Sequence, residues 1–502
     1  MTDYDVVVYG ATMPGVAAVR MACSVDRALS VLLVNPRRDW GGIGCGGGQN
    51  FWDRRFWTHG GERRLVQGGS FRKWYDELGQ AYDTEEMRER LESAVSGATT
   101  LDRWQATDVT VGDGGIASVD FTRLELSSRD LPRLGERRRT ATADVFVDAS
   151  ESGRLARLAG VPHSIGRAEW AEDDRQMAAT QMFRVSGIDW ERVRKRTRDG
   201  QSVFETRRDP TTNKRLFWGG GPVVDTADSV ADFSATHPRF DIKPMNAAEH
   251  RDGEFWVNTL LLYDIDGTRE PYDPNRPLRE DGSRPWCRAR ARRRARAVIE
   301  SREFEQAMRS FPGFETATLP AQRSADTIAE LLYLRETIHA GDDPHVVTRS
   351  DVKDAGVGPD DGADARHHHS RIGLGFYWLD NNGYATDGSD PELGATINPV
   401  YLPYEALKVP TCANLLVPGY AANVSGQAWF ALRVLPTLCV LGDAAGIAAA
   451  VAVGHDTAPT ADESFVERLQ RELRAKDAVL DKSRAPPFPQ RPPIAEEPLT
   501  DD

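Results

Sequence analysis

The sequence predicts an α/β protein whose N-terminal part is a βαβ unit, and three observations support this fold class. Two short apolar runs, Asp5–Tyr9 and Ser30–Asn35, are bounded by turn residues, which is typical of buried parallel strands. Between them, Pro14–Ala28 is rich in Ala and Val and has its proline in the first turn, where a missing N–H costs nothing. A third apolar run, Ala143–Ser150, ends in small residues and leads into "ESGRLARLAGV".

The segments between these runs alternate between glycine-rich, helical and strand-like patterns. A glycine-rich segment, Trp40–Asp53, follows the second strand directly. A polar stretch near Ser70–Val95 predicts a helix. Two strand-like runs, around Thr107–Val111 and Ile116–Leu126, flank Gly-Asp-Gly-Gly, and this spacing predicts a hairpin.

The middle of the chain, roughly Gln176–Asp390, differs in composition. It has more aromatic residues, more Arg and Asp, and long polar loops. The run Cys287–Phe311 predicts a strongly basic helix with a solvated face. Strand and turn signals return at Thr411–Tyr420, and the Pro-rich stretch from Ser483 predicts disorder.

This order of segments predicts one domain that is interrupted by another. The predicted parts are residues 1–180 and 398–460 for the two pieces of the first domain, 181–397 for the inserted domain, and 461–502 for a C-terminal helix with the Pro-rich tail.

Composition narrows the class of protein. The 502 residues are 40% hydrophobic and 28% charged, which is ordinary for a soluble globular protein. The net charge of −13 argues against a nucleic-acid partner, which would need a basic face. It does not argue against a dinucleotide, because backbone N–H groups and a helix N-terminus hold a pyrophosphate without basic side chains.

The cysteines and the N-terminus predict a cytoplasmic protein. No two cysteines are spaced as a CxxC pair, and five scattered thiols fit a reducing compartment. Residues Met1–Tyr4 run into a strand without a basic signal region. The stretch Val434–Gly454 is long enough to span a bilayer, but Asp443 near its middle would be costly in lipid. We expect a buried soluble helix there and no membrane partner.

The first turn carries the pattern Gly10-Ala-Thr12-Met-Pro-Gly15 between a strand and a helix. The first glycine allows the tight turn, and the last permits close contact between helix and strand. Thr12 replaces the usual middle glycine, and its hydroxyl is expected to add a donor for a phosphate. Asn35 ends the second strand, where an acidic residue normally binds the ribose hydroxyls. The pattern favours a dinucleotide site over a plain βαβ corner.

Two further segments favour this interpretation. The run Gly41–Gly48 costs backbone entropy, and its aromatic flanks argue against a flexible linker, so we expect its backbone to pass close to a ligand. The strand of "NLLVPGY" ends in a glycine, and "LGDAAGIAAA" is predicted to open a helix at Gly442 and Asp443. Such a helix N-terminus would stabilise negative charge. The alternative is a tightly packed Ala-rich core helix.

Several of these motifs together resemble the FAD-dependent oxidoreductase family of the glutathione-reductase-like class. The similar segments occur in the family's order from Asp5 to about Val453: "DVVVYGATMPGVAA", "VLLVNP", "GGIGCGGG", "DASESGRLARLAGVP", "FPGFETATL", "LRETIHAGDDPHVVTRSDV", "YLPYEALKVPTCANLLVPGY" and "LRVLPTLCVLGDAAGIAAA". The chain departs from the family pattern at Asn35, where Glu is usual, at Asp443, and at Gly426, which falls where many relatives carry a histidine.

The resemblance implies FAD as the cofactor, a Rossmann-like FAD-binding domain with an inserted α+β substrate domain, and a two-electron redox step. It places the cofactor-binding residues in the glycine-bearing turns and beside them. These are Gly10, Thr12, Gly15, Asn35, Gly41, Gly42, Cys45, Gly46, Val109, Asp148, Ala149, Ser150, Gly419, Arg433, Gly442, Asp443, Ala445 and Gly446. Cys45 is expected to pack closely rather than bind flavin covalently.

The candidate catalytic residues are Arg335, His339, Tyr377 and Asp380. If "RETIH" is helical, Arg335 and His339 share one face, although a salt-bridged structural helix is the favoured explanation of the pair. The aromatic stretch around Tyr377 and Asp380 suits a flat or sugar-like substrate, or else a core strand with a turn. Arg433 is expected to have a structural or flavin-contacting role.

The predicted function is an FAD-dependent hydride transfer with a small polar, possibly carbohydrate-like substrate. The alternatives are a flavin-binding sensor or assembly protein without turnover, and a flavin monooxygenase that uses NADPH. Adjacent histidines at His367–His369 rarely give good ligand geometry, so no metal is expected. The sequence names neither an electron acceptor nor an oligomeric state.

Overall fold

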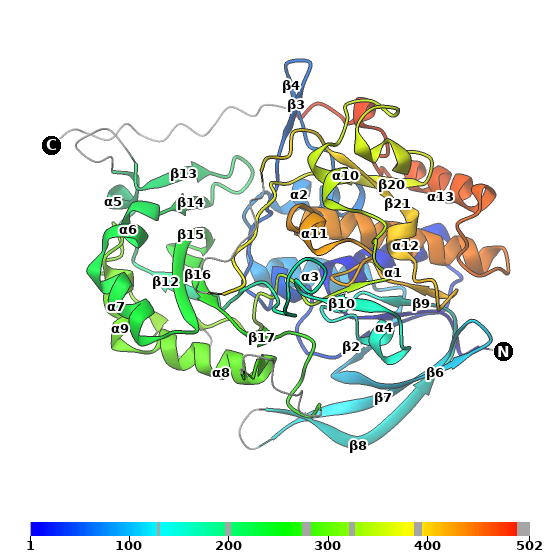
Figure 1. The fold of residues 1–502 in the computed structure, drawn as a ribbon, viewed down its shortest axis with the longest axis horizontal. Coiled ribbons are helices and arrows are strands. Elements are labelled where there is room, and N and C mark those ends of the chain that lie inside the picture. The colour runs from blue at the N-terminus through cyan, green and yellow to red at the C-terminus, as the bar shows by residue number, and fades with distance from the viewer. Residues whose placement is uncertain are drawn as a thin grey trace.

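The computed structural model (Figure 1) describes residues 2–127, 131–195, 202–273, 282, 284–320, 327–385 and 394–488. Its central feature is a five-stranded parallel sheet in the order β22-β9-β1-β2-β5. The strands are β1 (Tyr4–Tyr9), β2 (Val31–Asn35), β5 (Thr99–Asp102), β9 (Ala143–Asp148) and β22 (Leu415–Leu416). Helix α1 (Met13–Val25) joins β1 to β2, which confirms the predicted βαβ unit.

The two faces of this sheet are covered differently. Val6 and Val8 pack in one apolar cluster with α1 and α12 (Leu435–Gly454), whereas Val7 and Tyr9 face an antiparallel sheet on the other side. That second sheet consists of β6 (Trp104–Gly112), β7 (Gly115–Leu126) and β8 (Pro132–Ala141). The predicted hairpin is therefore confirmed. The third strand, β8, was not predicted because its charged, exposed residues show no apolar alternation.

Two predicted helices are each divided into two. The stretch near Ser70–Val95 contains α2 (Gly69–Leu78) and α3 (Thr84–Ala94), and the break follows Gly79 at φ +77°. The basic run contains α8 (Arg288–Ile299) and α9 (Arg302–Arg309), and Ser301 caps the second of these by accepting from the Phe304 N–H. Local capping chemistry thus ends helices that composition alone would continue.

The middle of the chain forms another, larger antiparallel sheet, drawn in green in Figure 1. Its path is β11-β16-β15-β14-β13, and β12 also pairs with β16. The strands are β11 (Ala179–Thr180), β12 (Phe183–Ser186), β13 (Phe204–Arg208), β14 (Arg215–Gly219), β15 (Phe240–Arg251) and β16 (Glu254–Leu262). Helices α5 (Trp190–Arg194), α6 (Gly221–Thr226), α7 (Asp228–Thr236), α8 and α9 belong to the same region.

In the part of the chain that the structure describes, four two-stranded sheets lie outside these larger sheets. Pairs of strands are formed by β3 (Trp57–His59) with β4 (Glu62–Arg64), β10 (His163–Ile165) with β19 (Ile338–Ala340), β17 (Ile265–Asp266) with β18 (Trp286–Cys287), and β20 (Arg371–Gly375) with β21 (Val400–Pro403). The remaining helices are α4 (Arg154–Leu158), α10 (Arg349–Lys353), α11 (Gly426–Leu432) and α13 (Glu463–Ala475). The domain boundaries at 180, 397 and 460 stay predictions.

The predicted disorder from Ser483 is wrong for the residues up to Phe488. The Phe488 N–H donates to the Arg63 carbonyl at 2.7 Å, and its ring lies 4.8 Å from that of Phe56. Lys482, just before this segment, is fully buried in an ion pair with Asp364 at 2.6 Å. Residues 489–502 of the predicted tail lie outside the described residues.

Helix α12 is the long apolar helix that the sequence suggested as a membrane candidate. Its length and composition suit a membrane span, but 89% of its most apolar window is buried inside the protein. The close partner is α1: a Cβ at Gly442 would lie 2.2 Å from the Pro14 carbonyl oxygen, and one at Gly446 would lie 2.0 Å from that of Ala18. The two glycines therefore let the helix backbones touch.

Replacing Gly446 with alanine is expected to destabilise the protein by about 1–3 kcal/mol, because the added methyl group must push α1 and α12 apart. Denaturant unfolding of the two proteins measures this difference. Gly454→Ala is the matched control at the end of the same helix, where nothing lies within 4 Å of an added Cβ. We expect the control to be neutral or slightly stabilising, and equal stabilities of the two variants would contradict the close-packing account.

Candidate functional site

The turn between β1 and α1 has the geometry of a phosphate-binding turn. Gly10 has φ +107°, and a Cβ there would lie 2.8 Å from the Ala149 carbonyl oxygen. Thr12 caps α1, since its Oγ1 accepts from the Gly15 N–H at 3.3 Å. The Thr12 hydroxyl donates to the Ala149 carbonyl at 2.7 Å. Its single hydrogen is therefore used within the protein, and the expected extra donor for a phosphate is absent in this geometry.

Other glycine-bearing segments meet this turn. The Gly41 N–H donates to the Ala11 carbonyl at 2.7 Å, and a Cβ at Gly42 would lie 3.3 Å from Thr12 Cγ2. Gly419 packs on the Ala149 backbone, with 3.3 Å between its ideal Cβ position and the carbonyl carbon. We call Gly10, Gly41, Gly42 and Gly419 with the start of α1 the glycine cradle. It lies at the carboxyl ends of β1, β2 and β9, where open α/β sheets bind their ligands.

The helix end beside the cradle is the start of α12, and the prediction that this helix opens at Gly442 is wrong. Residue 435 begins the helix, and a Cβ at Gly44 would lie 3.3 Å from Leu435 Cδ1. Gly442, Asp443, Ala445 and Gly446 lie in the middle of the helix instead, in its buried interior. Gly442 and Gly446 pack against α1 there, and the expected contact of these four residues with the cofactor stays a prediction.

Asp443 has a structural partner. It accepts from the Ser70 N–H at 2.7 Å and from the Ser70 hydroxyl, at the start of α2. Burial raises the pKa of Asp443 to about 7, and the hydrogen bonds from Ser70 oppose that rise. The Asp443 side chain thus holds the start of α2.

Three more predicted cofactor residues have their polar groups engaged within the protein. The Asn35 amide donates to the Asp39 carbonyl and to Asp102 Oδ1, both at 3.2 Å, and its oxygen accepts from the Arg37 N–H. Asp148 accepts from the N–H groups of Ser150 and Ala156, both at 3.1 Å. The Ser150 hydroxyl accepts from the Arg154 N–H. These contacts shape the edges of the cradle. Both hydrogens of the Asn35 amide group are donated within the protein, so neither is left for a ligand.

Cys45, Gly46 and Val109 serve mainly to pack the site. Cys45 is buried against Gly41, and burial raises the pKa of its thiol, so it stays protonated. The Gly46 carbonyl accepts from the Leu331 N–H at 3.0 Å, which ties the glycine-rich loop to the middle region. Val109 lies in β6 within the apolar cluster between the two sheets of the first domain.

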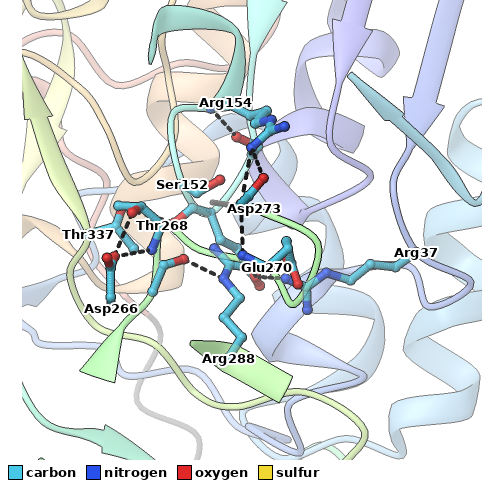
Figure 2. A network of polar contacts seen from close by, with 12 residues as sticks. Arg37, Ser152, Arg154, Asp266, Thr268, Glu270, Asp273, Arg288 and Thr337 are labelled. Atoms are coloured by element: carbon cyan, nitrogen blue, oxygen red, sulfur yellow. Dashed lines mark hydrogen bonds and ion pairs between the residues drawn. The ribbon is translucent and has the colours of Figure 1, made fainter. Parts of the chain in front are cut away.

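A polar network not predicted from the sequence lies next to the cradle (Figure 2). Glu151 Oε2 is 2.7 Å from Arg37 Nη2 and 3.2 Å from Arg288 Nη1. Nearby, Arg154 pairs with Asp273 at 3.2 Å. Since Arg288 and Asp273 come from the middle region, the network joins the two parts of the chain at the carboxyl edge of the parallel sheet.

Three of the four predicted catalytic residues, Arg335, Tyr377 and Asp380, line one pocket of about 420 Å³ together with Arg433. The pocket lies between the antiparallel sheet, the end of the glycine-rich loop and the segment before α12. Its other lining residues are Asp53, Lys243, Pro244, Asn246, Asn258, Leu261, Tyr263, Tyr333, Asn381, Asn382 and Gly383.

The two arginines of the pocket are held firmly. Arg433 Nη2 lies 2.7 Å from Asp380 Oδ2, and Arg433 Nη1 donates to the Tyr333 hydroxyl at 3.3 Å. Arg335 donates to the Ala178 carbonyl at 2.7 Å, and burial lowers the pKa of its guanidinium to about 10. Both groups remain charged at neutral pH and supply fixed positive charge.

Among the pocket residues that sequence reasoning missed, Asp53 and Lys243 have pKa values shifted toward neutrality. Burial raises the pKa of Asp53 to about 6 and lowers the pKa of Lys243 to about 7. Asp53 Oδ2 accepts from Gln49 Nε2 at 3.1 Å, and the Tyr377 hydroxyl lies 3.5 Å from Asp53 Oδ1. The only sequence signal for Asp53 was its position at the end of the glycine-rich segment.

His339 is not in the pocket, and the helix predicted for "RETIH" is wrong. The residue lies in β19, fully buried, with its Nε2 3.0 Å from Glu336 Oε1. The Tyr384 hydroxyl donates to the same oxygen at 3.1 Å. His339 lies within β19, which pairs with β10, whereas Arg335 precedes this strand and lines the pocket.

The histidines at His367–His369 contact different partners. His367 faces Asp351 at 3.4 Å, His368 faces Asp481 at 3.7 Å, and His369 Nδ1 contacts the Arg366 carbonyl. Across the described ranges, no group of three or more His, Cys, Asp or Glu side chains is arranged to hold a metal ion.

Comparison with solved structures gives remote similarities. The myxobacterial FAD-dependent halogenase CndH is 14% identical over 52% of this chain and 53% of its own (TM-score 0.26), and the flavin-dependent brominase Bmp2 is 12% identical over 63% and 65% (TM-score 0.30). The Bacillus halodurans glycerol-3-phosphate dehydrogenase complexed with FAD is 12% identical over 54% and 50% (TM-score 0.26). The chain thus spans about half to two thirds of the length of these proteins.

A family comparison covers nearly the whole chain. No curated protein matches it significantly. The profile of the family described as FAD dependent oxidoreductase, however, matches residues 5–473, which include the glycine cradle, the pocket and α12. The chain therefore belongs to the FAD dependent oxidoreductase family.

Proposed function

We propose that this FAD-dependent oxidoreductase oxidises or reduces a small polar, carbohydrate-like substrate in the pocket beside Asp53. The observation that carries the proposal is the meeting, in one pocket, of a carboxyl group and an amine whose pKa values lie near neutrality with two fixed arginines. Titratable groups with such shifts in a pocket are typical of acid–base sites.

The cradle residues fit FAD. The glycines leave no Cβ where a phosphate would approach, and α1, a helix of 13 residues, begins there with its N–H groups. Gly10, Gly41, Gly42 and Gly419 would therefore hold the pyrophosphate. FAD supplies the acceptor or donor for two electrons.

The pocket residues would then bind the substrate and handle its proton. When a hydroxyl group is oxidised, Asp53 in its ionised form accepts the hydroxyl proton as the C–H hydride leaves. In the reverse direction the protonated Asp53 returns this proton to the substrate oxygen. Lys243, Arg335 and the Asn246 and Asn258 amides offer hydrogen bonds to several oxygens, which supports a hydroxyl-rich substrate.

Anaerobic mixing of the holoenzyme with a panel of sugars, polyols and hydroxy acids tests this function. Bleaching of the flavin by one of these substrates, followed by reoxidation in air, is the expected result. NADPH is mixed with the holoenzyme in a parallel sample. Bleaching only by NADPH would favour a monooxygenase, and no bleaching by NADPH or by any member of the panel would favour a flavin-binding protein without turnover.

The acidic composition supports a protein without a nucleic-acid partner, and we propose that it has no membrane partner and works in the cytoplasm. Among the described helices, the one apolar enough to span a membrane is the buried α12.

The activity is expected to depend on pH in a defined way. For substrate oxidation, kcat/KM should rise as pH passes about 6, because Asp53 becomes ionised, and should fall above about 7, because Lys243 loses its charge. Lys243→Arg keeps the charge and should move only the alkaline limb upward, as measured by pH–rate profiles. An alkaline limb that stays in place in this variant would contradict the role of Lys243.

A further inference from the structure

Two buried polar atoms at the edge of the glycine cradle have no hydrogen-bond partner among the described residues. They are Glu151 Oε1 and Arg288 Nη2. The Glu151 side chain is 3% exposed, and its other oxygen, Oε2, already contacts both Arg37 and Arg288. A buried carboxylate oxygen or guanidinium N–H without a partner costs considerable free energy, so the pair is suited to a ligand that supplies the missing contacts.

The position of these two atoms indicates which ligand would bind to them. A Cβ at Gly42 would lie 3.1 Å from Glu151 Oε1, so this oxygen faces the cradle. Glu151 follows the end of β9, and Arg37 follows the end of β2, where dinucleotides place their adenosine ribose. Arg288 is the first residue of α8 and reaches the same point from the middle region (Figure 2).

The other contacts of Arg288 leave its Nη2 group available for a ligand. Its Nε donates to the Gly267 carbonyl, its Nη1 contacts Glu151 Oε2, and Nη1 also lies 3.9 Å from Glu270 Oε1. The guanidinium is therefore fixed in orientation by the protein, and only Nη2 remains for a ligand. A fork that is already oriented loses little entropy when it binds a phosphate.

We propose that Glu151 and Arg288 bind the ADP half of FAD. Glu151 Oε1 accepts a hydrogen bond from a ribose hydroxyl, and Arg288 Nη2 donates to a pyrophosphate oxygen. Glu151 thus supplies the ribose contact that was expected of Asn35, because the Asn35 amide donates to Asp39 and Asp102 instead. Arg37 and Arg288 lie beside the Glu151 carboxylate and balance its charge next to the phosphates.

Calorimetric titration of the flavin-free protein with FAD, ADP and FMN tests this assignment. In Glu151→Gln and Arg288→Lys, the Kd values for FAD and ADP are expected to rise by about tenfold to a hundredfold, since each change removes a hydrogen bond with a charged group. The Kd for FMN should stay within about twofold of the wild-type value.

Arg215→Gln is the matched control, because it breaks an ion pair with Glu249 at 2.6 Å in the antiparallel sheet, away from the cradle. Its affinities for all three ligands should be unchanged. Arg288→Lys keeps a positive charge beside Glu151, so it remains informative if Glu151→Gln does not fold. If Glu151→Gln and Arg288→Lys bind FAD and ADP as tightly as the wild type but have a lower Tm, the proposal is overturned. The ion pair would then have a structural role in joining the two parts of the chain. A loss confined to FMN would overturn the assignment to the ADP half.

Discussion

Replacing Asp53 with asparagine is expected to lower kcat/KM by about 10²–10⁴-fold while FAD still binds. Asparagine keeps the shape of the side chain but has no basic form, so the substrate proton loses its acceptor. Stopped-flow reduction of the flavin by the best substrate of the panel measures the loss directly. The acid limb of the pH profile near pH 6 should disappear in the same variant.

Asp209→Asn is the matched control for this substitution. Asp209 is also a buried carboxylate, but it accepts from the N–H groups of Ala81 and Thr211 at 2.8 Å and does not line the pocket. We expect the control to change stability and to leave the rate of flavin reduction unchanged. Wild-type reduction rates in Asp53→Asn would remove Asp53 from the mechanism.

Replacing Gly10 with alanine is expected to weaken FAD binding by about a hundredfold or more. Alanine at φ +107° is strained, and its Cβ would lie 2.8 Å from the Ala149 carbonyl oxygen, so the turn must shift. The shift displaces the N–H groups at the start of α1 from the pyrophosphate. The flavin content of the purified variant and its Kd for FAD measure the effect.

Gly114→Ala separates backbone strain from the loss of the cradle. Gly114 has φ +88° in the turn between β6 and β7, and nothing lies within 4 Å of an added Cβ. Both variants therefore carry the backbone strain of an alanine with positive φ, but only Gly10→Ala disturbs the cradle. Equal FAD contents in the two variants would show that Gly10 has no special role in binding.

The sequence predicted those parts of the fold and site that depend on local patterns. The βαβ unit and the β6–β7 hairpin were correctly identified, because buried parallel strands and glycine turns leave short-range signals. The turn from Gly10 to Gly15 was recognisable for the same reason: its glycines are required by backbone conformation and close approach.

Features that depend on packing were missed. Gly442 and Asp443 look like a helix start in sequence, but contact with α1 and Ser70 places them in the middle of α12. The strand β19 forms because β10 pairs with it, and no local pattern distinguishes it from a helix. Asp53 and Lys243 are far apart in the chain and meet only through tertiary structure, as do Glu151 and Arg288.

The flavin content of the purified protein tests the central claim most directly, which is that separate glycine turns fold into one site for FAD. A visible spectrum taken before and after acid precipitation shows whether flavin is present and whether it stays with the chain. We predict a yellow protein with about one FAD per chain, released into the supernatant because the protonated Cys45 thiol is packed against Gly41. A colourless, correctly folded protein that takes up no FAD when the compound is added would contradict the account.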